Sequence, residues 1–256
     1  MNVLDMFRLD GKVALVTGAS RGLGRAMAVA FAEAGADIAG LERTETCGDT
    51  CEQVRALGRR YLTVNGDLET STVSDLNAIV QAVAAEYGRL DILVNNAGII
   101  RRTPALDYSE QDWDAVNQIN LKAAFFLAQA AARVMRAQGG GKIINIASLL
   151  SFQGGILVPA YTAAKHGILG LTQALSNEWA ALGINVNAIA PGYMETDNTA
   201  ALRADEARRA AILARIPVGR WGMPDDLKGA AVFLASAASD YMHGAVIPVD
   251  GGWLAR

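Results

Sequence analysis

Histidine and cysteine are scarce in this sequence, which has two of each among 256 residues. His166 and His243 lie far apart along the chain, so a histidine-based zinc site or a Ser-His-Asp triad has poor material. Cys47 and Cys51 stand four residues apart and could bind a metal only with further ligands nearby. We therefore expect two reduced thiols, no metal site, and a chemistry that histidine does not carry.

Charged residues are also few, at 19% of the chain against 52% hydrophobic residues, and the net charge is -3. No cluster of lysine and arginine is interleaved with aromatic residues, so the sequence offers no binding surface for nucleic acid. So little charge covers the surface of a monomer poorly. We therefore expect an oligomer that buries apolar surface between its subunits.

Long apolar runs are missing as well. The first residues, MNVLDMFRLDGK, carry acids early and contain no uninterrupted apolar stretch of the kind found in secretion signals. No later segment stays apolar over the roughly 20 residues that a membrane-spanning helix needs. We therefore expect a cytoplasmic protein with no membrane partner.

Short β-branched runs alternate with longer helical patterns along the whole chain. The runs that predict strands are KVALVT, DIAGL, YLTVN, DILVNNAG, KIINIAS, NVNAIAPG and AVIPVDGG. This alternation is typical of parallel strands joined by right-handed crossovers. Since neither a repeat nor a linker interrupts it, we predict a single α/β domain over residues 1–256.

Residues 193–226 form the one long stretch without a clear strand pattern. Its charged content, TDNTAALRADEARRAAILARI, predicts one or two surface helices, which would suit a simple insertion on the rim of the domain. Gly192 and Gly219 bracket the stretch as candidate hinges, and we favour a lid or substrate loop.

The first predicted strand runs into TGASRGLG, which places Gly18, Gly22 and Gly24 between that strand and a helical pattern. Glycines let the backbone turn sharply and approach a pyrophosphate, whose charge the helix N-terminus then stabilises. The spacing G-x-x-x-G-x-G differs from G-x-G-x-x-G, and glycines in such a turn can be purely structural. Their place after the first strand of an alternating chain nevertheless predicts a dinucleotide site.

The end of the second predicted strand bears on the choice of dinucleotide. Glu42 closes that strand 24 residues after Gly18, where a carboxylate can accept hydrogen bonds from ribose hydroxyls and repel a 2′-phosphate. Arg21 in the glycine loop and Arg43 after Glu42 favour the opposite choice, because guanidinium groups pair well with phosphate. We favour NAD(H), with NADP(H) as the alternative.

The stretch PAYTAAKHG places Tyr161 and Lys165 four residues apart, on one face of a predicted helix. A tyrosine hydroxyl has an ordinary pKa of about 10, and a neighbouring ammonium lowers it. We predict that Lys165 activates Tyr161 as the general acid or base for a carbonyl or alcohol. Ser148, at the end of KIINIAS, could hydrogen-bond the same oxygen. Alone, a tyrosine and a lysine at this spacing are common on amphipathic helices.

Together the motifs resemble the short-chain dehydrogenase/reductase family. They are TGASRGLG, Asp67, NNAG at residues 95–98, Asn120, Ser148, Tyr161-x-x-x-Lys165 and PG at residues 191–192, and they cover essentially the whole chain. The resemblance implies a single Rossmann-type, doubly wound parallel sheet of about seven strands with helices on both faces, usually assembled as a homotetramer. It also implies hydride transfer between a nicotinamide and a carbonyl or alcohol.

The resemblance further implies roles for individual residues. The catalytic set would be Asn120, Ser148, Tyr161 and Lys165, with Asn120 holding a water in the proton relay from Lys165. The residues that would bind the cofactor are Gly18, Ser20, Arg21, Gly22, Leu23, Gly24, Glu42, Asp67, Leu68, Asn95, Ala97, Gly98, Tyr161, Lys165, Pro191, Gly192 and Thr196. Among these, Asp67 matches an acid that contacts adenine, and Thr196 matches a residue that anchors the nicotinamide end.

A narrower likeness within the family is carried by NNAGIIRR, SLLSFQGG, VNAIAPGYMETDNT, RIPVGRWGMPDDLKG and VDGGWLAR. It implies reduction of a deoxy diketo sugar acid, 3-deoxy-D-glycero-2,5-hexodiulosonate, to 2-dehydro-3-deoxy-D-gluconate in uronate, pectin or alginate breakdown.

Several polar residues are compatible with such a substrate. Arg101 and Arg102 could grip its carboxylate with paired hydrogen bonds, although surface positions or subunit contacts would suit either arginine equally well. Gln153 and Asn198 could bond its hydroxyls. The alternatives are a 3-oxoacyl-[acyl-carrier-protein] reductase, a sugar or polyol dehydrogenase of the same family, or a non-catalytic nucleotide-binding regulatory protein. The intact Ser, Tyr and Lys set argues against the last.

Overall fold

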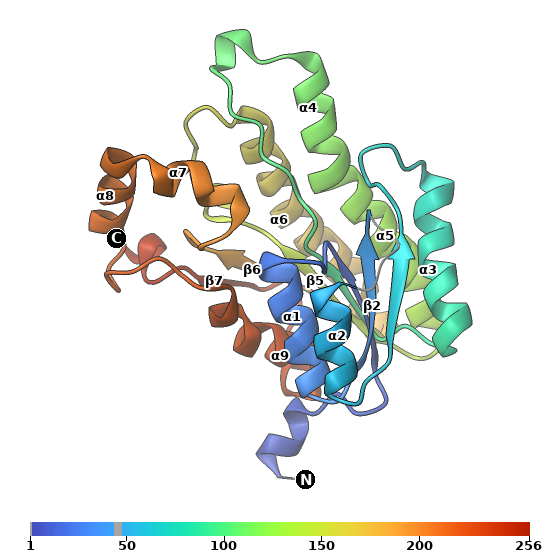
Figure 1. Cartoon of the computed structure of the whole chain (residues 1–256). Helices are drawn as coiled ribbons and strands as arrows, with labels where there is room; N and C mark the ends of the chain where they lie inside the picture. Colours follow the sequence, from blue (N-terminus) through green and yellow to red (C-terminus); the bar gives the residue numbers. More distant parts are fainter. Residues whose placement is uncertain (1, 44–47) are drawn as a thin grey trace.

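One parallel sheet organises the computed structural model, which describes residues 2–43 and 48–256. Its strands are β1 (Val13–Thr17), β2 (Asp37–Glu42), β3 (Tyr61–Asn65), β4 (Ile92–Asn95), β5 (Gly141–Ile146), β6 (Ile184–Pro191) and β7 (Val246–Val249). They lie in the order β3-β2-β1-β4-β5-β6-β7, and every pairing is parallel (Figure 1). Each of the predicted strands is therefore confirmed, and so is the doubly wound sheet.

Helices cover both faces of the sheet (Figure 1). In the described residues the α-helices are α1 (Gly22–Glu33), α2 (Asp49–Ala56), α3 (Val73–Tyr87), α4 (Glu110–Asn117), α5 (Ala124–Ala137), α6 (Pro159–Trp179), α7 (Ala200–Ala204), α8 (Glu206–Arg215) and α9 (Lys228–Ala235). The short 3-10 helices are η1 (Val3–Phe7), η2 (Ala105–Asp107), η4 (Leu149–Ser151), η5 (Ala180–Leu182), η6 (Asp197–Thr199), η7 (Pro224–Leu227), η8 (Ala237–Ser239) and η9 (Trp253–Ala255). Across these ranges, none of the helices combines the length and the apolar character that crossing a bilayer demands.

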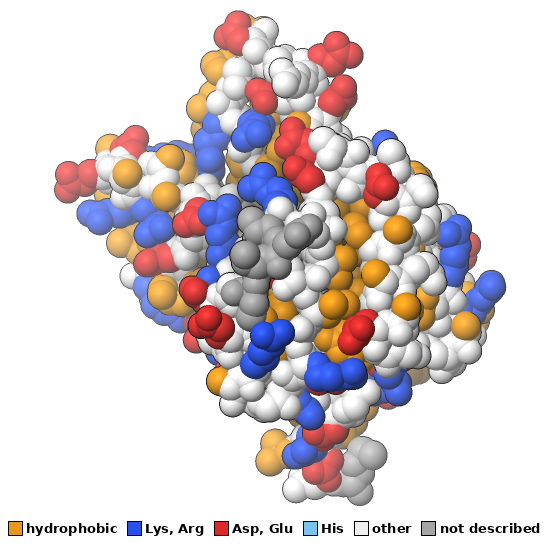
Figure 2. All heavy atoms as spheres, turned by 45° about the vertical axis from the view of Figure 1, so that its right-hand side comes forward, with side chains coloured by type: hydrophobic (Ala, Val, Ile, Leu, Met, Phe, Trp, Pro, Cys, Tyr) orange, Lys and Arg blue, Asp and Glu red, His pale blue; other side chains and the backbone are white. Residues whose placement is uncertain are grey.

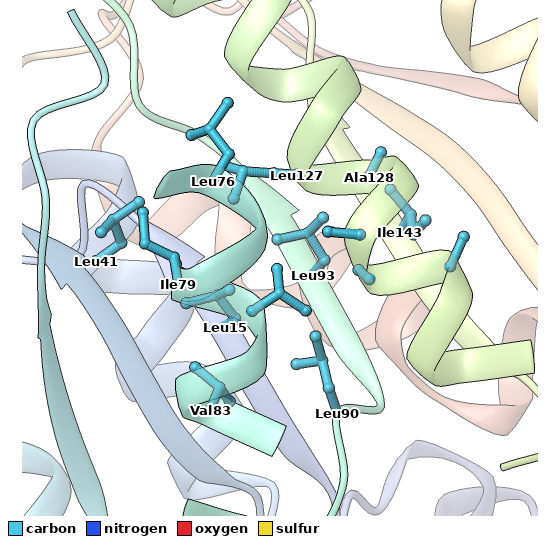
Figure 3. Packing of buried hydrophobic residues seen from close by; sticks show 14 of the residues in the cluster. Leu15, Leu41, Leu76, Ile79, Val83, Leu90, Leu93, Leu127, Ala128 and Ile143 are labelled. Carbon is cyan, nitrogen blue, oxygen red and sulfur yellow. The ribbon is translucent and has the colours of Figure 1, made fainter. Parts of the chain in front are cut away.

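The hydrophobic core has two layers, one on each face of the sheet. All of β1 is buried, and its alternate residues point to opposite layers. Leu15 faces the layer under α3 and α5, where Figure 3 shows Ile79 and Leu127 turned toward the strands. Val16 faces the layer that α1, α2 and α9 cover. The carboxyl ends of the strands are thus held rigidly at one edge of the sheet, where doubly wound folds bind ligands.

A π-helical segment, η3 (Gln118–Ala123), joins α4 to α5 within the helical pattern between the fourth and fifth predicted strands. Asn120 lies in this segment, and its Nδ2 donates to the carbonyl oxygen of Val116 at 2.8 Å. Such segments insert an extra residue into a helix and are frequent at functional sites. The hydrophobic pattern did not predict the interruption, because one extra residue barely disturbs a helical period.

The 193–226 segment stands at the rim of the domain. It contains η6, α7, α8 and most of η7, and α7 and α8 project beside the sheet in Figure 1. Ile212, Ile216 and Trp221 anchor it to Leu149 and Trp253 in a small apolar cluster. The predicted surface helices are confirmed.

The expectation of two reduced thiols is wrong for Cys51. This residue is buried in α2 and is disulfide-bonded, while Cys47 lies outside the described residues. Whether two thiols can join depends on the distance and direction of their Cβ atoms in the folded chain. Their spacing along the sequence does not carry that information.

Candidate active site

The glycine-rich loop joins β1 to α1 at the carboxyl edge of the sheet. Gly18 and Gly22 have φ angles of +66° and +54°, a left-handed conformation that favours glycine. A Cβ atom on Gly24 would lie 2.1 Å from the carbonyl oxygen of Gly18, so only glycine lets α1 pack against the loop. Arg21, the N-cap of α1, gives the amides of the first turn no side-chain hydrogen bond. Free amides and a closely approachable backbone fit the pyrophosphate of a dinucleotide.

Two residues that the sequence motifs contain, but that we did not predict as functional, hold this loop in place. Thr17 Oγ1 accepts hydrogen bonds from the amides of Asn96 and Ala97, at 2.9 and 2.8 Å. The side chain of Asn96 in turn donates to the carbonyl oxygens of Thr17 and Gly18, at 2.8 and 3.3 Å. The NNAG turn and the glycine loop therefore form one rigid unit. Thr17 stands in TGASRGLG and Asn96 in NNAG, and this position inside a motif was the sequence signal that could have identified them.

Asn95 and Asn120 lie in the floor of the site, and each is anchored through its Nδ2 atom. Asn95 Nδ2 donates to Asn145 Oδ1 at 2.9 Å, whereas Asn120 Nδ2 binds backbone carbonyls. Their Oδ1 atoms are buried without a hydrogen-bond partner in the described part of the chain. A Cβ on Gly98 would lie 2.5 Å from Asn120 Oδ1, so glycine is required beside it. Buried acceptors of this kind demand a donor, which fits the predicted place of Asn120 in a proton relay.

The residues predicted to meet the adenosine end lie beyond β2 and β3. Glu42 ends β2 with 6% of its surface exposed, and its Oε1 accepts a hydrogen bond from the hydroxyl of Tyr61. Asp67 is exposed just after β3, and its Oδ1 accepts from the amide of Glu69 at 3.0 Å. Leu68 packs its side chain into the core, so its backbone is the part left to face a ligand. Tyr61 was not predicted from the sequence.

Ser20 and Leu23 belong to the loop and to the first turn of α1. Ser20 is exposed, and its carbonyl oxygen accepts from Arg25 Nη2 at 2.6 Å. The side chain of Leu23 packs against the core layer under α1. Neither contact points away from the predicted cofactor site.

The 193–226 segment begins directly over the glycine loop. Pro191 ends β6, and a Cβ on the following Gly192 would lie 2.6 Å from the Cα of Asp250. Farther on, Thr196 Cγ2 lies 3.7 Å from the position that a Cβ on Gly22 would take. Thr196 of the segment therefore approaches Gly22 at the start of α1.

Ser148, Tyr161 and Lys165 meet where β5 ends and α6 begins. Pro159 opens α6 at a position that suits its missing amide hydrogen. Lys165 is 4% exposed, lies with its Nζ 5.5 Å from the centre of the Tyr161 ring, and donates to the carbonyl oxygen of Ile146 at 2.6 Å. Burial lowers the pKa of Lys165 to about 8. The structure thus brings the predicted catalytic side chains together.

The pKa of Tyr161 differs from our expectation. The pKa of Tyr161 is raised above its ordinary value. The largest cause is burial of the hydroxyl group, since the phenolate is disfavoured away from water. A hydrogen bond with Ser148 and the positive charge of Arg102 act in the opposite direction. The prediction that Lys165 lowers this pKa is therefore wrong for this arrangement, because its ammonium is directed to the Ile146 carbonyl.

The two predicted substrate arginines have different surroundings. Arg102 acts on the pKa of Tyr161 and donates from Nη2 to the carbonyl oxygen of Asn198 at 3.0 Å. Arg101 forms an ion pair with Asp112 of α4, with Nε and Oδ1 3.4 Å apart. Arg102, rather than Arg101, is therefore the arginine whose charge acts on Tyr161.

The backbone next to Arg102 is bonded to the chain that leads into α6. The amide of Thr103 donates to the carbonyl oxygen of Leu157, just before α6, at 3.0 Å. Leu157 has a φ angle of +68°, which is uncommon for a branched residue. Gln153, the remaining substrate candidate, accepts from Arg215 Nη2 of α8 at 3.4 Å. Gln153 and Asn198 thus each pair with an arginine at the cleft.

Several cationic side chains gather on one part of the surface. Figure 2 shows Lys and Arg side chains gathered between the upper projection of the molecule and the projection at the left. Arg21 and Arg102 are both exposed. A field of this sign attracts anionic ligands.

Comparison with known proteins identifies the family of this chain. A family model described as short chain dehydrogenase matches residues 12–207. The chain is 59% identical over 255 residues to the 2-dehydro-3-deoxy-D-gluconate 5-dehydrogenase of Escherichia coli (strain K12), which covers 99% of this chain and 100% of that protein. The predicted family and the narrower likeness are thereby confirmed.

Solved structures are similar over the same length. A crystal structure from Agrobacterium tumefaciens, named as a candidate 2-deoxy-D-gluconate 3-dehydrogenase and containing NADP, is 56% identical with a TM-score of 0.91, over 98% of this chain and 99% of that one. The gluconate 5-dehydrogenase of Burkholderia cenocepacia, in complex with NADP and tartrate, is 42% identical with a TM-score of 0.95 over 100% of both chains.

Proposed function

The chain belongs to the short-chain dehydrogenase family and is an NAD(P)-dependent oxidoreductase, and from this premise we propose its substrate, its preferred cofactor and the roles of its residues. The substrate is a deoxy diketo sugar acid, with 3-deoxy-D-glycero-2,5-hexodiulosonate reduced to 2-dehydro-3-deoxy-D-gluconate in uronate, pectin or alginate breakdown. The name of the Escherichia coli relative supports this choice.

One observation carries the proposal within this chain: the positive charge of Arg102 acts on the hydroxyl of Tyr161 and favours its ionised form. A guanidinium can bind a carboxylate through two parallel hydrogen bonds. A sugar acid gripped there by its carboxylate lies with its carbon chain next to the proton donor. An acyl thioester offers no carboxylate for Arg102, so the sugar acid is the better fit.

The cofactor would be held by the glycine loop and the first turn of α1, by the turn from Asn95 to Gly98, and by the backbone from Pro191 to Thr196. When bound, its reduced nicotinamide supplies the hydride. The chain's own residues prepare this site: the loop glycines admit a close approach of the backbone, and Thr17 holds the loop to the NNAG turn.

The proton moves through the side chains around Tyr161. Tyr161 donates its hydroxyl proton to the substrate oxygen that gains negative charge, and Ser148 hydrogen-bonds the same oxygen. Lys165 stands at the start of the relay that returns the proton, and its pKa of about 8 makes it able to release a proton near neutral pH. Asn120, with its unpartnered Oδ1, holds the water through which the proton is replaced.

For the cofactor we propose a preference for NAD(H). Glu42 closes β2 where it would meet the adenosine ribose and repel a 2′-phosphate. Arg21, the residue best placed to favour NADP(H), is bound to Asp197. The NADP present in both solved relatives favours the alternative, and a titration of the purified protein with each reduced cofactor decides between them.

We also propose that the 193–226 segment acts as a lid.

We further propose that the protein is a cytoplasmic homotetramer. Exposed apolar side chains support the assembly, among them Leu106, Trp113 and Ile156, which are 99%, 43% and 75% exposed. Such surface is unusual on a monomer when it is contiguous. Light scattering at micromolar concentration tests the assembly, and a monomer would contradict it.

The substrate proposal is tested by nicotinamide oxidation with the purified protein. NADH and NADPH are each supplied with 3-deoxy-D-glycero-2,5-hexodiulosonate, 5-ketogluconate and a 3-oxoacyl thioester. Rapid turnover of the diketo sugar acid supports the proposal. Turnover of the thioester alone would keep the catalytic residues and overturn the substrate, and no turnover would favour a binding protein.

A further inference from the structure

A tyrosine on the edge strand β3 reaches the acidic residue that ends the neighbouring strand β2. In the register of the two strands Tyr61 pairs with Ile38, four residues and thus about 13 Å before Glu42 along β2. Ile38, Gly40 and Glu42 share one face of the sheet, because side chains alternate along a strand. The Tyr61 side chain extends along this face, and its hydroxyl donates to Glu42 Oε1.

Gly40 makes this contact possible. A Cβ atom at Gly40 would lie 2.0 Å from the Tyr61 hydroxyl oxygen and 2.9 Å from Glu42 Oε1. Any larger residue at position 40 would therefore occupy the place of the hydroxyl group. The absence of a side chain leaves the passage through which the tyrosine reaches the carboxylate.

The contact is buried and has a fixed direction. Tyr61 is 7% exposed and Glu42 is 6% exposed. Burial, followed by the hydrogen bond with Glu42, raises the pKa of Tyr61, so the hydroxyl keeps its proton and remains the donor. A buried carboxylate is costly unless donors satisfy it, and Tyr61 is the donor that the structure provides.

The other carboxylate oxygen remains available to a ligand. Within residues 2–43 and 48–256, Oε2 of Glu42 has no hydrogen-bond partner. With Oε1 held by Tyr61, the carboxylate is fixed in one orientation, and Oε2 is the acceptor that it can offer. A fixed acceptor binds a ribose hydroxyl without the entropic cost of ordering a mobile side chain.

We propose that Tyr61 is a positioning residue, which fixes the carboxylate of Glu42 and thereby sets the preference of this chain for NAD(H) over NADP(H). The inference rests on the proposed contact between Glu42 and the adenosine ribose. Without the Tyr61 hydroxyl, the carboxylate can turn toward solvent. It then binds the ribose less well and repels a 2′-phosphate less strongly.

The test compares cofactor binding by Tyr61→Phe and by wild-type protein, with no substrate present. Dissociation constants for NADH and NADPH are measured by fluorescence titration. Loss of a hydrogen bond to a charged group predicts that NADH binds roughly tenfold more weakly, while NADPH binding stays level or improves. The ratio of the two constants therefore shifts about tenfold toward NADPH.

Tyr87→Phe is the matched control. The Tyr87 hydroxyl donates to the carbonyl oxygen of Ile38 at 2.9 Å, on the same strand as Glu42, but makes no contact with the carboxylate. Tyr87→Phe removes one hydrogen bond from a tyrosine to β2 but leaves the hydrogen bond between Tyr61 and Glu42 in place. The ratio of constants is expected to equal the wild-type ratio, and melting temperatures of both variants show any general loss of stability.

A second comparison separates a positioning role from a structural one. In a Glu42→Ala background the carboxylate is gone, so Tyr61→Phe should no longer change the ratio of constants. An additional shift in that background would overturn the inference, as would an unchanged ratio in Tyr61→Phe alone or an equal shift in Tyr87→Phe.

The inference and the proposed cofactor preference can fail separately. The wild-type ratio tests the preference for NAD(H), and a ratio that favours NADPH contradicts it. The change of the ratio on substitution tests the role of Tyr61, whatever the wild-type value is.

Discussion

Asp197, at the start of η6, forms an ion pair with Arg21 of the glycine loop, 176 residues earlier in the sequence. Both side chains are largely exposed, so the pair contributes little to stability. Its consequence is positional. It ties the 193–226 segment to the mouth of the cofactor site and engages the guanidinium that would otherwise be free to meet a 2′-phosphate.

Asp197→Asn is therefore expected to tighten NADPH binding by roughly threefold and to leave NADH binding unchanged, because a freed Arg21 can pair with the extra phosphate. Titration of both reduced cofactors measures the effect. Asp10→Asn, which removes the exposed partner of Arg8 elsewhere on the surface, makes the same change in net charge and should alter neither constant. Tighter NADPH binding by the control as well would show a general charge effect instead.

Tyr161→Phe should retain cofactor binding and lose most turnover. The substitution removes the hydroxyl that we propose as the proton donor, and general acid catalysis typically contributes about 10²- to 10⁴-fold. Stopped-flow measurement of nicotinamide oxidation, together with a cofactor titration, separates the two effects. Near-normal turnover would contradict the general-acid role.

Arg102→Met is expected to raise the KM for the diketo sugar acid by about tenfold or more, since a charge-assisted carboxylate contact is lost. It should also raise the pKa of Tyr161, because the Arg102 charge lowers it. The matched control is Arg101→Met, whose side chain pairs with Asp112, and its KM should stay near the wild-type value. Steady-state kinetics on both variants test the carboxylate contact, and an equal rise in both would point to a less specific field.

The stability of the protein should depend on the ionisation of Lys165. Burial lowers the pKa of this group in the folded chain from 10.5 to about 8. Between these two pH values the unfolded chain binds more protons than the folded one, so the free energy of unfolding rises with pH across that window, by up to about 3 kcal/mol. Below pH 8 or so the lysine is charged in both the folded and the unfolded chain, so the full free-energy penalty of burying its charge is present.

Lys165→Met removes this group, and the difference between wild type and variant isolates its effect. The wild type should gain stability relative to the variant as pH rises from about 8 to 10.5. Urea unfolding at several pH values measures it. If the free energies of unfolding of the two proteins changed equally with pH, the amine would not be desolvated, which would contradict the structure.

Gly24→Ala should destabilise the fold and abolish dinucleotide binding. Its Cβ would lie 2.1 Å from the Gly18 carbonyl oxygen and 2.6 Å from Asn96 Nδ2, so the backbone must shift, at a cost of about 1–3 kcal/mol. Gly229→Ala in α9, where a Cβ meets nothing within 4 Å, should be neutral or stabilising by up to about 1 kcal/mol. Thermal unfolding and cofactor titration compare the two, and equal effects would contradict the close approach.

The order of strands and helices was determined by the sequence alone. Strands that are buried on both faces must be apolar along their whole length, and the helices between them must carry an apolar stripe. These two periods are local properties of the chain. The pairing of Tyr161 with Lys165 was predictable for the same reason, since residues four apart share one face of any helix.

Contacts between distant segments were decided only by the tertiary structure. The charge of Arg102 acts on Tyr161, whereas Arg101 pairs with Asp112, and both relationships join separate elements of the fold. The reach of Tyr61 to Glu42 depends on the register of β3 against β2 and on the space above Gly40. Neither has a signature within one stretch of sequence. Local periodicity determines which elements form, whereas the relative placement of elements, set by packing of the whole core, determines which side chains meet.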